Sequence, residues 1–87
     1  MNYTVYWRQV AENKLADMWV NDPDRAEIAG AADAIDELLQ IDPLNQGESR
    51  DGNTRIFFYP PLVVLYLVDS ENHWVYVLTI GRSKPLV

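Results

Sequence analysis

The sequence contains no cysteine and only one histidine among its 87 residues. Without cysteine the chain forms no disulfide and offers no thiolate ligand to a metal ion. His73, the single histidine, lies at a predicted turn and has no second histidine or carboxylate at the spacing of metal ligands. We therefore expect His73 to be an ordinary surface residue, and we expect neither a metal site nor a cofactor.

Long apolar runs and glycine-rich loops are also missing. No window reaches the roughly 18 consecutive apolar residues of a membrane helix. Residues 1–4 lack the charged and apolar regions of a signal peptide. With four glycines, the chain has no glycine-rich phosphate loop, and it has no G-x-S-x-G nucleophile motif. The length fits one domain over residues 1–87, which we expect in the cytoplasm and away from membranes.

Basic side chains are scarce, with seven Lys and Arg against thirteen Asp and Glu and a net charge of −6. The imbalance lies in residues 1–43, which hold three basic and nine acidic side chains, whereas residues 44–87 hold four of each. Surfaces that bind nucleic acids are usually basic, because Lys and Arg contact the phosphates. The charge argues against a general nucleic-acid binder, but it allows a small cationic pocket in the C-terminal half.

The N-terminal half predicts a strand followed by two helices. Residues 3–7 are rich in β-branched and aromatic side chains, which is typical of a strand. Over residues 9–20, apolar side chains recur with helical spacing at Ala11, Leu15, Met18 and Trp19. A second helical stripe comprises Ile28, Ala31, Ala32, Ile35, Leu38 and Leu39.

The limits of the second helix follow from its flanking residues. Asp22 is suited to cap the helix and Pro23 to occupy its first position, while Pro43 ends it. A loop this short makes the two helices antiparallel neighbours. The acidic residues outside the stripe are expected to form a solvated face: Asp33, Asp36 and Glu37.

The C-terminal half predicts a meander of strands over residues 54–59, 63–68 and 74–80, with a further short strand over residues 48–50. The connections are short, and short connections join antiparallel strands. The unbroken apolar run over residues 62–68 indicates a central strand covered on both faces. Helices placed before a run of strands predict an α+β fold, with the helical hairpin packed on one face of a mainly antiparallel sheet.

Four basic residues lie near the ends of the predicted strands, namely Arg50, Arg55, Arg82 and Lys84. If the strands pair as expected, Arg55 and Arg82 come near one another, and clustered guanidinium groups bind phosphates or carboxylates. The alternative is that these residues provide solubilising charge. For Tyr66, in the middle of a strand, the default interpretation is core packing with its hydroxyl hydrogen-bonded at the surface.

Several segments follow one another in an order and spacing that are typical of a known family. They are Trp7-Arg8 with the helix that follows, and residues 42–50, 55–58, 62–69 and 75–82. Together these segments cover nearly the whole chain, and no single motif among them is highly specific. The pattern resembles the RelE/ParE superfamily of toxins from type II toxin–antitoxin systems.

The resemblance implies a compact toxin whose partner is a cognate antitoxin protein. RelE-like members cut messenger RNA at the ribosome without a metal ion, using basic residues and general acid–base catalysis. ParE-like members inhibit DNA gyrase and are not nucleases. Carried over by position, Arg55, Arg82 and Tyr66 would be catalytic. The neighbouring basic residues Arg50 and Lys84 are expected to bind the substrate.

The sequence departs from the nuclease pattern at two places. RelE-type nucleases commonly have an arginine three residues before the mid-strand tyrosine, where this chain has Val63. The C-terminal residues 83–87 lack the tyrosine or histidine that often assists cleavage. Two hypotheses follow. The chain is either a growth-inhibiting toxin that cleaves mRNA, or a non-nuclease binding module. The latter would be a gyrase-directed toxin or a catalytically silent relative that only pairs with an antitoxin.

Overall fold

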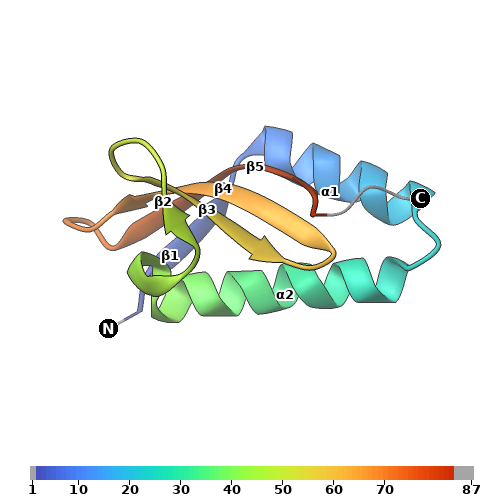
Figure 1. The fold of residues 1–87 in the computed structure, drawn as a ribbon, viewed down its shortest axis with the longest axis horizontal. Coiled ribbons are helices and arrows are strands. Elements are labelled where there is room, and N and C mark those ends of the chain that lie inside the picture. Colours follow the sequence, from blue (N-terminus) through green and yellow to red (C-terminus); the bar gives the residue numbers. More distant parts are fainter. Residues whose placement is uncertain (1, 84–87) are drawn as a thin grey trace.

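The computed structural model describes residues 2–83. Figure 1 shows the elements in the order β1 (Thr4–Trp7), α1 (Gln9–Asn21), α2 (Arg25–Ile41), the 3₁₀ turn η1 (Pro43–Asn45), β2 (Glu48–Ser49), β3 (Thr54–Tyr59), β4 (Leu62–Asp69) and β5 (Trp74–Arg82). The predicted α+β order is confirmed, and the short strand before the turn is present. Among residues 2–83, neither helix combines the length and the hydropathy of a transmembrane span.

The five strands form one sheet in the order β1-β5-β4-β3-β2. Strands β2 to β5 pair antiparallel in sequence order, which confirms the predicted meander. Only β1 runs parallel to its neighbour β5. A parallel pair needs a long connection, and here the helices and the other strands lie between the two partners in sequence.

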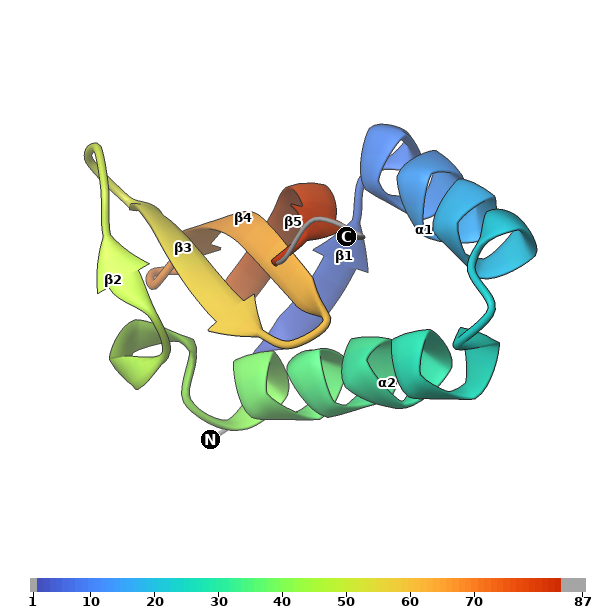
Figure 2. The same cartoon turned by 45° about the vertical axis from the view of Figure 1, so that its right-hand side comes forward.

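Strand β4 lies at the centre of the sheet, as its apolar sequence predicts, but only one of its faces is fully covered. Leu62, Val64, Tyr66 and Val68 are buried, while the residues between them are half-buried. The helices pack on the buried side, where α1 contacts β5 and α2 contacts β1 and β4 (Figure 2). The expected covering of both faces is wrong, because no element among residues 2–83 lies over the second face.

The two helices bury their apolar stripes to different extents. In α2, five of the six predicted positions are buried: Ile28, Ala31, Ala32, Ile35 and Leu39. In α1 only Ala11 is buried, and Trp19, assigned to the stripe, is 46% exposed. The hairpin is therefore closed where α2 meets the sheet and open along part of the seam between the helices.

The loop between the helices differs from the prediction, because α2 begins at Arg25 rather than at Pro23. Asp22 does not cap α2. It follows the last residue of α1, and its Oδ1 accepts a hydrogen bond from the backbone N–H of Asp24 at 2.8 Å. This bond stabilises the turn in the way typical of an aspartate two residues before the donor. The second carboxylate oxygen of Asp22 is left for another contact.

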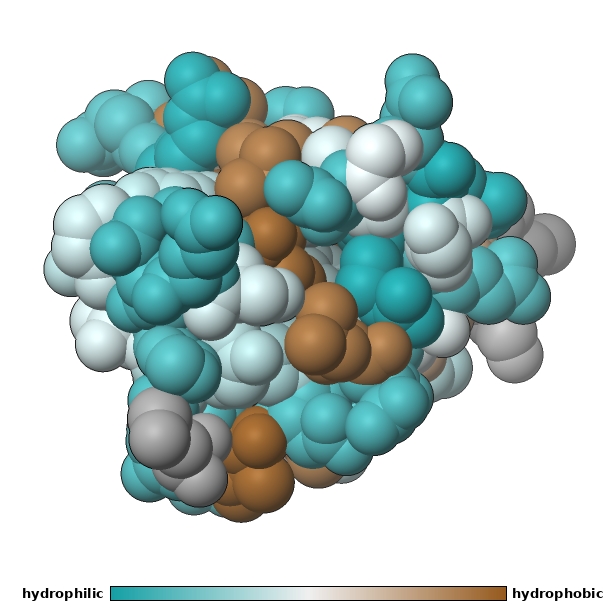
Figure 3. Space-filling model, turned by 90° about the vertical axis from the view of Figure 1, so that its left-hand side faces the viewer, coloured by the Kyte–Doolittle hydropathy of each residue, from teal (hydrophilic) through white to brown (hydrophobic). Residues whose placement is uncertain are grey.

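The core lies between the hairpin and the covered face of the sheet, and Tyr66 is its largest fully buried side chain. Burying one large apolar side chain contributes about 1.5–3 kcal/mol. A domain this small leaves apolar groups at its surface. Figure 3 shows them between hydrophilic groups on the end of the molecule that is at the left in Figure 1. Where exposed apolar groups adjoin one another, they are candidates for an interface.

Candidate functional site

Tyr66 and Arg55 lie opposite one another on β4 and β3, with both side chains on the helix-facing side of the sheet. The Tyr66 hydroxyl donates to the carbonyl oxygens of Pro43 at 2.6 Å and Gln46 at 2.8 Å. Arg55 donates from Nε to the same Gln46 oxygen at 2.9 Å, and from Nη2 to the Gly47 oxygen at 3.1 Å. Together the two side chains hold the segment after α2 against the sheet.

This arrangement favours a structural role for Tyr66. Burial raises the pKa of the Tyr66 hydroxyl above its ordinary value and outweighs the opposing effect of Arg55. The hydroxyl is therefore protonated at neutral pH and acts as a hydrogen-bond donor.

The hollow beside Arg55 measures about 90 Å³, whereas ligand pockets commonly measure about 300–1,000 Å³. A nucleotide does not fit there.

Arg82 is held at a different place. Its Nη1 pairs with Oδ2 of Asp22, so the carboxylate joins the end of β5 to the loop between the helices. The side chain of Asp22 is almost completely buried, and that of Arg82 is 24% exposed. The hollow beside this pair, about 230 Å³, is also lined by Asp17. A phosphate entering it would meet two carboxylates and one guanidinium group.

The expectation that Arg55 and Arg82 gather in one site is wrong. Arg55 is opposite Tyr66 on β4, and Arg82 is opposite Leu62, four residues along the same strand. The partners of Arg55 follow the C-terminal end of α2, whereas Asp22 precedes its N-terminal end. A 17-residue helix is about 25 Å long. Each arginine is bound by the loop at its own end of α2.

The remaining predicted residues do not complete a cationic site. Arg50 is exposed after β2, and its Nη1 lies 3.9 Å from Oε2 of Glu48. Lys84 lies outside the described residues. His73, expected at the surface, is half-buried at the turn before β5, and its ring centroid lies 5.1 Å from that of Tyr3. No group of three or more His, Asp or Glu side chains among residues 2–83 has the geometry of a metal site.

The face of the sheet turned away from the helices, called here the open face, is apolar. The alternation of side chains along each strand and the strand register place the following residues on it: Tyr6, Trp74, Tyr76, Leu67, Leu65, Val63, Ile56 and Phe58. Several of these side chains are exposed, among them Phe58 at 55%. A sheet face with this composition is unusual for a surface in contact with water alone.

Three aromatic rings form a cluster on the open face. The ring of Tyr6 stacks on that of Tyr76, with 5.6 Å between the centroids, and meets the edge of Trp74 at 5.8 Å. Trp74 and Tyr76 are in edge contact at 6.1 Å. Tyr6 and Trp74 are 46% and 39% exposed. Tyrosine and tryptophan, together with arginine, are enriched among the residues that contribute most to binding at protein interfaces.

The strands place no cation on the open face. Both strand arginines, Arg55 and Arg82, are turned to the helix side by their register. Val63, at the position where the family resemblance implied an arginine, lies on the open face. At the rim of this face, Lys14 donates to Oγ1 of Thr79 at 2.9 Å. The central part of the face thus lacks the charge that phosphate binding needs.

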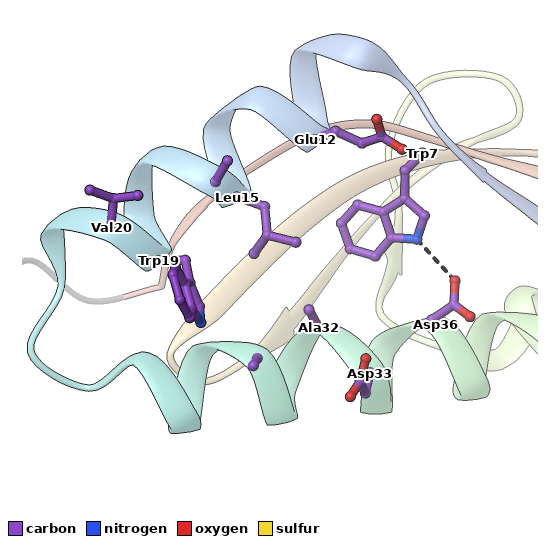
Figure 4. A pocket seen from close by; sticks show the side chains of 10 residues that line it. Trp7, Glu12, Leu15, Trp19, Val20, Ala32, Asp33 and Asp36 are labelled. Carbon is purple, nitrogen blue, oxygen red and sulfur yellow. Dashed lines mark hydrogen bonds between the residues drawn. The ribbon is translucent and has the colours of Figure 1, made fainter.

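A second surface feature is the groove between α1 and α2, which measures about 540 Å³ (Figure 4). Trp7 lies at one end, and its indole Nε1 donates to Oδ1 of Asp36 at 2.9 Å. Leu15 and Ala32 form its apolar base, and Trp19 borders the other end. The charged groups in its lining are all acidic: Glu12, Asp33 and Asp36.

The sequence interpretation missed this groove. The sequence pattern predicts a solvated helix face for Asp33 and Asp36 and places Trp19 in the apolar stripe of its helix. The signals that pointed to the groove were the concentration of negative charge on the helices and the run of alanines in α2, with small side chains at Ala29 and Ala32. Neither signal specifies how far two helices stand apart.

No protein-family model matches the sequence, and no curated protein is similar to it at the level of sequence. Solved structures do match its fold. A chain of the toxin–antitoxin complex RelBE2 from Mycobacterium tuberculosis superposes with a TM-score of 0.74 at 20% identity, over 94% of this chain and 92% of that chain.

Two further toxin structures show the same likeness. A chain of the chromosomal ParDE toxin–antitoxin system of P. aeruginosa gives a TM-score of 0.70 at 16% identity, over 94% of this chain and 97% of that one. The isolated RelE toxin of E. coli gives 0.65 at 14% identity, over 97% and 87%. The helical hairpin on a mainly antiparallel sheet is therefore the fold of the RelE and ParE toxins, as the sequence resemblance predicted.

Proposed function

We propose that this chain is the toxin component of a toxin–antitoxin pair, and that it inhibits growth by binding a protein target through the open face without cleaving RNA. The first half is supported by the fold, which it shares with chains of two toxin–antitoxin systems. The second half rests on one observation: the central strands present aromatic and aliphatic side chains on the open face and turn both arginines away from it.

Charge is the physical reason to prefer binding over RNA cleavage. Metal-independent cleavage of a phosphodiester develops negative charge that cationic or hydrogen-bonding groups must stabilise, and removing one such group commonly slows a reaction about 10²–10³-fold. Arg55 and Arg82 already bind loop carbonyls and a carboxylate. To reach an RNA on the open face, each would have to leave those partners and cross to the other side of the sheet.

The composition of the open face suits a protein target. The buried centre of a protein interface is depleted in charge and enriched in aromatic side chains. The cluster of Tyr6, Trp74 and Tyr76 provides such a centre. DNA gyrase, the target of ParE-like toxins in the family resemblance, is one target of this class.

Induced expression in a bacterium tests both halves of the proposal. Growth should stop while the ends of cellular transcripts, mapped by sequencing, match those of uninduced cells. Co-expression of the product of an adjacent gene should restore growth, and the two proteins should co-purify. New transcript ends after induction would refute the binding mode, and unchanged growth would refute the assignment as a toxin. A supercoiling assay with purified protein then tests gyrase as the target.

A further inference from the structure

The groove between α1 and α2 has the dimensions and the lining of a protein-binding site, although the proposed function does not use it. Its volume of about 540 Å³ is the largest among the surface hollows described above. The base and walls are apolar, and the small side chains of Ala16, Ala29 and Ala32 allow a ligand to approach the helix backbones closely. Trp19, 46% exposed, and Val20, 59% exposed, extend this apolar surface at one end.

The charged side chains that line the groove have one sign. Glu12 on α1 and Asp33 on α2 both line it, and Asp36 adds a third carboxylate beside Trp7 (Figure 4). The residues of the two helices and their loop, 9–41, hold eight acidic and two basic side chains. The three carboxylates of the lining border the same hollow, so their effects on a bound ligand add.

Neither basic residue of this region neutralises the groove lining. Lys14 is bonded to Thr79 on β5. Arg25 stacks on the ring of Trp19 at 5.2 Å and donates to the carbonyl oxygen of Val20 at 3.2 Å, so it lies beside one end of the groove and is not part of its lining. The rest of the groove has an apolar base between acidic rims.

We propose that this groove binds a cationic amphipathic helix of a protein partner. In recognition of a helix by a groove, apolar side chains spaced by three and four residues enter the base, and charged residues on both flanks meet the rims. Here the base would take Leu-sized side chains, and Lys or Arg on the flanks would meet Glu12, Asp33 and Asp36. An acidic helix with the same apolar residues would be repelled.

The proposal rests on the proposed function only for the source of the helix, which would be the antitoxin. The preference of the groove for a cationic helix is a property of this chain and is tested without the antitoxin. The three tryptophans provide the readout, because Trp7 and Trp19 line the groove while Trp74 lies on the open face.

The test uses two synthetic helical peptides of about five turns, one with leucine and lysine faces and one with the same leucines and glutamate. Each is titrated into protein labelled with ¹⁵N in the tryptophan side chains. The lysine peptide should shift the indole signals of Trp7 and Trp19 and leave that of Trp74 in place, and its binding should weaken in high salt. Equal affinity for both peptides, absence of binding, or a shift confined to Trp74 would overturn the proposal.

Matched variants separate the groove from the general acidity of the helices. Glu12→Gln with Asp33→Asn removes two charges from the rims and should weaken binding of the lysine peptide roughly five-fold, because each exposed ion pair contributes little. Glu27→Gln with Glu37→Gln removes two charges of α2 outside the groove lining. This variant should change the affinity for the lysine peptide less than about two-fold, because exposed charges that do not contact the peptide contribute little. Equal effects of the two double variants would show that net charge alone drives binding, which would refute a specific site.

A failure of the groove proposal can be distinguished experimentally from a failure of the proposed function. If the protein encoded beside this gene binds and shifts only Trp74, the toxin assignment stands and the groove proposal fails. If the lysine peptide binds in the groove and induction leaves growth unchanged, the groove proposal stands and the toxin assignment fails.

Discussion

Arg82 at the end of β5 is paired with Asp22 in the loop between the helices, across 60 residues of sequence. The pair joins the last strand of the sheet to the turn of the hairpin. Because the Asp22 side chain is 4% exposed, its charge depends on this partner and on the Asp24 N–H for stabilisation. An arginine predicted to be catalytic thus fixes the position of the helices on the sheet.

Breaking this pair should destabilise the fold. Arg82→Met leaves the Asp22 carboxylate buried without its partner, and we expect a loss of about 3 kcal/mol in the free energy of unfolding. Adding Asp22→Asn removes the uncompensated charge while keeping an acceptor for Asp24, so the double variant should regain at least about 1 kcal/mol. Urea unfolding followed by tryptophan fluorescence measures both values. If the losses in the free energy of unfolding caused by the two substitutions simply add in the double variant, Arg82 and Asp22 do not stabilise one another.

Tyr66→Phe should destabilise the protein at neutral pH without disturbing the core. The variant keeps the buried ring and removes the hydroxyl that donates to the carbonyl oxygens of Pro43 and Gln46. Leaving these acceptors short of a donor costs about 1–3 kcal/mol. Tyr59→Phe, which removes a hydroxyl from a half-buried ring of the neighbouring strand, is the matched control. Equal effects of the two variants would show that the two hydrogen bonds contribute no stability.

The raised pKa of Tyr66 predicts a loss of stability in alkali. A folded-state pKa above the unfolded value of about 10 means that the folded protein holds the proton more tightly, so stability falls as pH rises above about 10. The contribution is fully present at lower pH. The free energy of unfolding should therefore decline above about pH 10 more steeply in the wild type than in Tyr66→Phe. Parallel curves for the two proteins would refute this assignment.

Substituting alanine at Gly47 and at Gly52 distinguishes the cost of an unfavourable backbone conformation from the cost of a steric clash. Both have positive φ, at 61° and 58°. A Cβ at Gly47 would lie 2.0 Å from the carbonyl oxygen of Ile56, whereas one at Gly52 meets no atom within 4 Å. Gly52→Ala should cost about 1 kcal/mol from the left-handed conformation alone. Gly47→Ala should cost about 2 kcal/mol more, because β2 must move off β3. Equal losses in thermal unfolding would contradict the contact.

The open face should carry the growth inhibition. Tyr6→Ser with Trp74→Ser removes two rings of the aromatic cluster, and we expect a stability loss of about 1–3 kcal/mol together with loss of growth arrest. Val10→Ser with Ile41→Ser changes two residues that are equally or more exposed, at 50% and 65%, and lie elsewhere. This control should still arrest growth. Arrest by both double variants, at matched amounts of folded protein, would exclude the open face as the active surface.

The elements of the fold follow from local sequence patterns. The stripe Ile28 to Leu39 specifies a helix because residues three and four apart share one face, and β4 is recognisable from its unbroken apolar run. Short connections then make the meander antiparallel. The sequence resemblance predicted how these helices and strands combine in the complete fold, and the solved structures confirm that fold.

The sequence by itself determined the elements, the absence of thiol chemistry, and the concentration of negative charge on the helical hairpin. Tertiary structure decided which side of the sheet each arginine faces and where the helices separate. The strand register places Arg55 opposite Tyr66 and Arg82 opposite Leu62. The loops at the two ends of α2 then bind the two arginines at separate places. Sequence spacing describes neighbours along one element, whereas a site depends on contacts between elements, which are fixed only when the helices pack on the sheet.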